Sequence, residues 1–62
     1  MRTGVDGFQG QRLNQLRMAQ NLTLAELGEQ IGRSSSTVSA WEKGSQLPEV
    51  ESFDRLCHVF QV

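Results

Sequence analysis

The chain has 62 residues and a net charge of −1, with one cysteine and one histidine. A domain of this size buries only about 60% of the surface that its unfolded chain exposes, so it has room for one small core and none for a deep catalytic cleft. One cysteine excludes an internal disulfide, and one cysteine with one histidine is too few for an ordinary zinc site, so we expect a reducing, cytoplasmic setting, no metal and no cofactor.

Residues 1–8 contain two glycines and no periodic pattern, and we expect them to form a flexible N-terminal arm. Within the arm, Arg2 either belongs to a disordered terminus or reaches into a DNA minor groove, as homeodomain arms do. The segment also lacks the apolar centre of a signal peptide. No stretch of the chain approaches the roughly 20 apolar residues of a membrane span, so we expect no membrane association.

A first helix is predicted over about residues 9–20. Leu13, Leu16 and Ala19 recur every three residues and form an apolar stripe of helical period. Asn21 follows the stripe and is expected to end the helix in the left-handed conformation. The pattern therefore indicates one amphipathic helix directly after the arm.

A second helix is predicted over about residues 24–31. Thr23 and Glu26 have the spacing of a capping box, which marks the start of a helix. Gly32 provides the residue at which the chain turns left-handed and the helix ends. The inward face consists of Leu27, Gly28 and Ile31. At the glycine of this face, the missing side chain is expected to let another helix approach closely.

A third and a fourth helix are predicted over about residues 35–43 and 49–60. Ser34 is the expected cap of the third helix, and Gly44 its end. Val38 and Trp41 form its inward face. The fourth helix follows Pro48 and has an apolar face made of Val50, Phe53, Leu56, Cys57 and Phe60. No segment alternates with period two, so we expect an all-α bundle of four helices, with residues 9–62 as one domain.

The second and third helices have the spacing of a helix-turn-helix, in which the second helix of the motif reads DNA. Short side chains fit the major groove, which is about 12 Å wide, and a serine hydroxyl both donates and accepts hydrogen bonds. The residues expected to face the bases are Ser35, Ser36, Ser39 and Ala40. The alternative is that the serine-rich run is a flexible loop and that the helix starts later.

Phosphate contacts are expected around this helix. The N-termini of helices attract phosphate, and two such termini lie at Thr23 and Ser34. Arg33 lies in the turn between the helices, and Lys43 lies at the end of the third helix, where it either contacts phosphate or balances the helix dipole. Residues 1–44 carry five cations against four carboxylates, so the charge contribution to DNA binding and its salt dependence are expected to be small.

The chain resembles the Cro/C1-type helix-turn-helix family of phage repressors, also called XRE, over residues 10–62. The matching pattern is GQRLNQLRMAQNLTLAELGEQIGRSSSTVSAWEKGSQLP followed by FDRLCHVFQV. The resemblance implies a lambda-repressor-like fold and a structural ion pair between Arg17 and Glu42. It also implies base contacts from Ser35, Ser36, Ser39 and Ala40, and phosphate contacts near Arg12, Thr23, Ser34 and Lys43.

The sequence departs from the family pattern in three ways. Leu24 occupies a position where the family often has a glutamine that contacts phosphate, and a leucine cannot donate. Gly28 replaces the usual alanine, a change that loosens a helix by about 1 kcal/mol. The resemblance also implies a fifth helix, often used for dimerisation, and we expect this helix to be absent from these 62 residues, which stop before it.

We therefore predict a transcriptional regulator, specifically a repressor, that binds double-stranded DNA as a homodimer on a palindromic site. The alternative is an antitoxin-like or other protein-interaction module that sequesters a partner protein. An enzyme is not expected. His58 is the only histidine, and its neighbour Cys57 projects about 100° away on the same helix, so the two do not form a catalytic pair.

Overall fold

A computed structural model describes residues 8–62, so all but the last residue of the expected arm lies outside the described residues. The elements are α1 (Gly10–Ala19), α2 (Leu24–Ile31), α3 (Ser35–Lys43) and α4 (Val50–Phe60). Residues 8–62 contain no strand, and every helix begins and ends within one residue of its expected position. The prediction of a four-helix, all-α domain is confirmed. Among these residues, no helix combines the length and apolar character that crossing a membrane requires.

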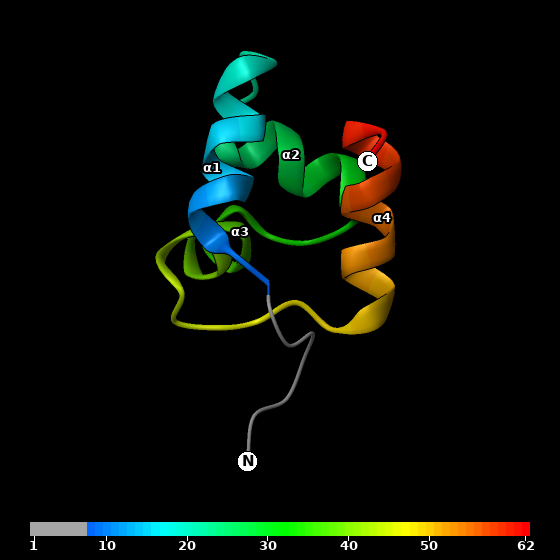
Figure 1. Cartoon of the computed structure of the whole chain (residues 1–62). Coiled ribbons are helices and arrows are strands. Elements are labelled where there is room, and N and C mark those ends of the chain that lie inside the picture. The colour runs from blue at the N-terminus through cyan, green and yellow to red at the C-terminus, as the bar shows by residue number, and fades with distance from the viewer. Residues whose placement is uncertain (1–7) are drawn as a thin grey trace.

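Figure 1 shows how the four helices are arranged. α1 and α4 stand on opposite sides, and α2 crosses between them. α3 packs against both α1 and α2, while α4 packs mainly against α2. The third helix is therefore held by two neighbours, and the rest of its surface faces outward.

One small core lies where the helices meet, and every helix contributes to it. Trp41 of α3 is its largest fully buried side chain, with 1% of its surface exposed. Within residues 8–62, the buried residues of this hydrophobic cluster are Leu13, Leu27, Ile31, Val38, Trp41, Leu56 and Phe60. At the edge of this core, the rings of Phe8 and Phe53 pack edge to face, with centroids 6.2 Å apart.

The ends of α2 and α3 are fixed by local hydrogen bonds. The Thr23 hydroxyl accepts from the Glu26 amide at 3.0 Å, and the Glu26 carboxylate accepts from the Thr23 amide at 2.8 Å. The Ser34 hydroxyl accepts from the Thr37 amide at 3.2 Å. Gly32, with φ of +73°, ends α2 in the left-handed conformation. These contacts satisfy backbone groups at the helix ends that have no partner within the helices. Residues at the ends of α2 and α3 therefore determine where these helices begin and end.

Two expectations for the apolar stripes are wrong. Val50 is 75% exposed, and Ser52, only 4% exposed, faces inward in its place. The inward line of α4 follows Ser52, Leu56 and Phe60, and Val50 lies about 200° around the helix from Ser52. Ala19 is exposed because it is the last residue of α1, beyond the contact with the other helices.

The close approach expected at Gly28 occurs, but what approaches is a turn and not another helix. A Cβ atom there would collide with the carbonyl oxygen of Arg33. The Arg33 amide also donates to the Gly28 carbonyl at 2.8 Å. Two helices meet most tightly at Gly10, where a Cβ atom would lie 2.6 Å from the carbonyl oxygen of Glu42 and would also collide with that of Trp41. The start of α1 therefore rests on the backbone of α3.

Arg17 and Glu42 connect α1 to α3. Arg17 Nε lies 2.7 Å from Glu42 Oε2, with 12% and 9% of the two side chains exposed. Asn14 donates a further hydrogen bond to Glu42 Oε1 at 2.9 Å, and Arg17 donates to the Leu22 carbonyl at 2.8 Å. The hydrogen bond to Glu42 raises the pKa of Arg17 above its usual value. The expected ion pair is thus present as part of a nearly buried, fully hydrogen-bonded group.

Replacing Gly10 with alanine tests the contact between α1 and α3. We expect Gly10→Ala to lower the free energy of unfolding by about 1–3 kcal/mol, because the added methyl group overpacks the interface. Helix propensity alone predicts the opposite, a gain of up to about 1 kcal/mol. Urea unfolding followed by circular dichroism measures the difference, with the exposed α1 substitution Gln15→Ala as control. A Gly10→Ala domain as stable as wild type would contradict this packing.

Replacing Arg17 with methionine tests the ion pair. Because the change leaves a nearly buried carboxylate without its cation, we expect Arg17→Met to cost roughly 3–5 kcal/mol of stability. Arg12→Met, an exposed arginine on the same helix, should cost less than about 0.5 kcal/mol. Both values come from the same urea titration. A loss of 1 kcal/mol or less for Arg17→Met would mean that the pair behaves as a loose surface contact.

Candidate nucleic-acid interface

α3 has one buried face and one face of short side chains. Val38 and Trp41 are 0% and 1% exposed and anchor the helix in the core. On the other side, Ser35 and Ser36 are exposed, and Ser39 and Ala40 are half-buried. We call these four residues the serine face. No side chain of this face is longer than a serine, so a flat or convex ligand is able to approach the helix backbone closely.

The hydroxyl groups at the start of α3 form a local network. Ser34 Oγ lies 3.1 Å from Ser36 Oγ and 2.9 Å from Thr37 Oγ1, in addition to its capping bond. Within residues 8–62, Ser35 and Ser39 make no side-chain hydrogen bond. Their hydroxyls are therefore available to donate to or accept from a ligand, while the cap holds the first turn of the helix in place.

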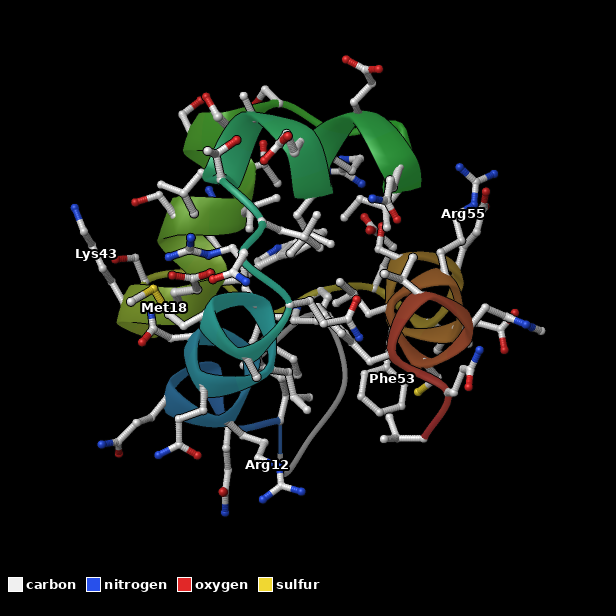
Figure 2. All side chains as sticks on the ribbon, turned by 90° about the horizontal axis from the view of Figure 1, so that it is seen from above. Arg12, Met18, Lys43, Phe53 and Arg55 are labelled. Atoms are coloured by element: carbon white, nitrogen blue, oxygen red, sulfur yellow. The ribbon has the colours of Figure 1, made fainter. Side chains whose placement is uncertain are left out.

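The expected phosphate-binding residues do not all lie together. Thr23 and Ser34 are exposed at the starts of α2 and α3, and Lys43 is exposed at the end of α3, with no ion pair among residues 8–62. Figure 2 shows Lys43 and Arg12 leaving the domain on different sides. Arg12 borders the apolar hollow between α1 and α4, which Phe53 also lines. Ser34 directly precedes the serine face, and Lys43 lines one hollow with Ser39 and with Leu24, the residue after Thr23, whereas Arg12 lies apart from Lys43.

A hollow beside the serine face contains two residues that the sequence analysis did not single out. It is lined by Gln11, Asn14, Leu24, Ser39, Glu42 and Lys43. Asn14 lies three residues before Arg17 on the same face of α1. Because the family resemblance implies that Arg17 contacts α3, this spacing is a signal that Asn14 borders α3 as well. Gln11 lies about 120° around the helix from Arg17, and the spacing gives no such signal for it. Leu24 gives the hollow an apolar wall.

Arg33 lies in the turn, but its side chain is engaged within the domain. Its Nη1 atom donates to Glu49 Oε1 at 2.7 Å and to Ser52 Oγ at 3.1 Å. The guanidinium carbon lies 5.6 Å from the centroid of the Trp41 ring. Hydrogen bonds from Ser52 and then from Arg33 hold the pKa of Glu49 below its usual value. The position of Arg33 in the turn predicts a phosphate contact, but its side chain is bound to Glu49 and Ser52 within the domain.

The remaining polar groups on α4 form local pairs. His58 Nε2 lies 3.7 Å from Asp54 Oδ2, one helical turn away. Cys57 is half-buried beside them. In the described part of the chain, no three His, Cys, Asp or Glu side chains are grouped so as to hold a metal ion. α4 therefore offers no arrangement that rivals the serine face as a site.

Comparison with known proteins places this geometry in context. The family described as "Helix-turn-helix domain" matches residues 10–62. The HTH-type transcriptional activator BcrR of Enterococcus faecalis is 38% identical over 52 residues, which are 84% of this chain and 26% of that protein. The crystal structure of the P22 c2 repressor protein in complex with synthetic operator 9T superimposes with a TM-score of 0.82 at 29% identity, over 84% of this chain and 79% of that one. The chain thus spans about a quarter of the activator that it matches.

Proposed function

The chain belongs to this helix-turn-helix family, and on that premise we propose that residues 9–62 bind double-stranded DNA sequence-specifically and regulate transcription. The observation that carries the proposal is the division of α3 into a face anchored by Trp41 and an opposite serine face of short side chains, which is exposed in its N-terminal half. A helix presented in this way fits the major groove, where its N-terminal half reaches base edges.

Base contacts come from Ser35, Ser36, Ser39 and Ala40 in this proposal. Serine hydroxyls accept from or donate to several bases, and the alanine methyl group contacts the methyl group of thymine. None of the four makes the bidentate contact that arginine makes with guanine. Direct base recognition is therefore modest, and DNA shape and bridging water supply part of the specificity.

Phosphate contacts flank the serine face. The backbone amides that directly follow the caps Thr23 and Ser34 bind phosphate at the N-termini of α2 and α3, and Lys43 binds a phosphate beyond the end of α3. Arg12, which leaves α1 on another side, contributes its charge only at longer range. With so few cations at the interface, binding depends only weakly on salt.

The regulator acts as a homodimer and as a repressor in this proposal. A single small DNA-binding module buries only about 600–1,000 Å² on DNA, so two copies on a palindromic site are needed for useful affinity. Of the two similar proteins, one is named a repressor and the other an activator. We propose repression because occupancy of a DNA site suffices for it, whereas activation needs a further contact.

A second candidate function is an antitoxin-like module that sequesters a partner protein. The observation that favours it is the exposed side of α4, where Glu49, Glu51 and Asp54 outnumber Arg55. Such a surface repels DNA and suits a basic protein partner. A domain that binds no duplex at low salt but binds a basic protein would support this alternative.

Removing the hydroxyls of the serine face tests base recognition. Binding sites are first selected from random duplexes with the wild-type domain. We expect Ser35→Ala/Ser36→Ala/Ser39→Ala to remain folded by circular dichroism and to lose about tenfold or more of its preference for the selected site, because it removes three base contacts together and the loss of one matched base pair typically costs roughly 1–3 kcal/mol.

The control is Ser45→Ala, an exposed serine beyond the end of α3, which should keep the wild-type preference. Preservation of the preference in the triple variant would contradict recognition through these hydroxyls. Failure of the wild-type domain to select any site, even at low salt, would contradict the proposed function itself.

Replacing Lys43 with glutamine tests the phosphate contact. We expect Lys43→Gln to weaken binding to the selected site and to random duplexes by the same factor. It should also lower the slope of log K against log salt by about 1. Lys43→Arg keeps the charge and should retain the wild-type slope. Fluorescence anisotropy over a salt series measures all three proteins. An unchanged slope for Lys43→Gln would show that the lysine serves only the end of α3.

A further inference from the structure

We propose that Arg33 is a positioning residue, which fixes the orientation of α3 by tying the α2–α3 turn to the start of α4, and that it does not contact phosphate. This inference rests on the proposed DNA binding, because orientation of α3 matters only if its serine face must match the major groove. The position of Arg33 in the turn does not by itself suggest this role.

The backbone of Arg33 is held inside the turn. Gly32 before it is left-handed, and Ser34 after it caps α3. The Arg33 amide donates to the Gly28 carbonyl at 2.8 Å, and the Arg33 carbonyl fills the space that a side chain at Gly28 would occupy. A displacement of Arg33 therefore moves the end of α2 and the start of α3 together.

The side chain of Arg33 reaches two further helices. On α4 it binds Ser52, and just before α4 it binds Glu49, which itself accepts a hydrogen bond from the Ser52 hydroxyl. On α3 it lies over the ring of Trp41. A single exposed ion pair contributes little to stability, and the Arg33–Glu49 pair is 37% and 54% exposed. Here, however, one guanidinium nitrogen donates to two acceptors while the group lies over an aromatic ring, and Ser52 is itself buried.

A second arginine holds the other side of the same turn. Arg55, on α4, donates to the carbonyl of Ile31, the last residue of α2, at 3.1 Å. Its second terminal nitrogen binds Glu51 at 3.0 Å. Figure 2 shows Arg55 leaving α4 on the side of α2. Since α4 contacts the turn through two independent side chains, the turn has little freedom to tilt α3.

The two possible roles of Arg33 predict opposite effects when Glu49 loses its charge. If Arg33 binds phosphate, Glu49→Gln releases the guanidinium group and removes a repulsive carboxylate, so DNA binding tightens. If Arg33 positions α3, Glu49→Gln loosens the turn, and binding to the selected site weakens. Arg33→Lys separates the roles as well, because lysine keeps the charge but not the planar group that spans Glu49, Ser52 and Trp41.

The experiment measures affinity for the selected site and for a random duplex, over a salt series, with folding checked by circular dichroism. We expect about tenfold weaker binding to the selected site for each of the single variants Arg33→Gln, Arg33→Lys and Glu49→Gln. The double variant Arg33→Gln/Glu49→Gln should bind no more weakly than either single variant, because the two residues act through one contact. The salt slope of Arg33→Gln should stay at the wild-type value. Glu29→Gln removes an equal charge from the exposed side of α2 and should change nothing.

Tighter binding by Glu49→Gln, or wild-type affinity of Arg33→Lys with a slope reduced by about 1 in Arg33→Gln, would overturn the proposal in favour of a phosphate contact. Amide hydrogen exchange in the free domain gives a readout without DNA. Arg33→Gln and Glu49→Gln should each accelerate exchange at Thr37 and Val38, in the first turn of α3, while Glu29→Gln does not. Unchanged exchange would overturn the proposal even if the wild-type domain selected no DNA site.

Discussion

Trp41 is the side chain on which the placement of α3 depends. It is 1% exposed, and its own carbonyl oxygen supports the start of α1 at Gly10. The next residue, Glu42, binds Arg17 of α1, and Arg33 of the turn lies over the indole ring. All of these contacts approach α3 from its inner side. These contacts anchor α3 without using its outer side. In a chain of only 62 residues, the outer side therefore remains available for the proposed base contacts.

The contacts around Trp41 divide into two kinds of constraint. Caps at Thr23 and Ser34 and left-handed residues at Gly32 and Gly44 determine where each helix of the motif begins and ends. The polar groups formed by Arg17 with Glu42 and by Arg33 with Glu49 then determine how the helices lie relative to one another. The seven residues of the hydrophobic core cluster stabilise the folded domain, while the directional hydrogen bonds fix the orientation of the helices relative to one another. A small domain without a disulfide needs both.

The sequence predicts the local features well and the long-range ones poorly. Helix bounds follow from capping residues, glycines and apolar spacing, all of which act within a few residues of one another. The partners of Arg33 lie 16 and 19 residues away, and no spacing rule joins them to the turn. Likewise, Val50 has the spacing of an inward residue, but α4 packs along the line of Ser52, Leu56 and Phe60 and leaves Val50 75% exposed. The pair of Arg17 and Glu42 was expected only through the family resemblance.

The central claim is that α3 enters the major groove with its serine face toward the bases. A nitroxide spin label on a thymine methyl position in the middle of a selected half-site tests it directly, by paramagnetic broadening of backbone amide signals in the bound domain. The account predicts the strongest broadening at Ser35, Ser36 and Ser39, weaker effects at Thr23, and none on the exposed side of α4. Broadening centred on α4, with the amides of α3 unaffected, would contradict it.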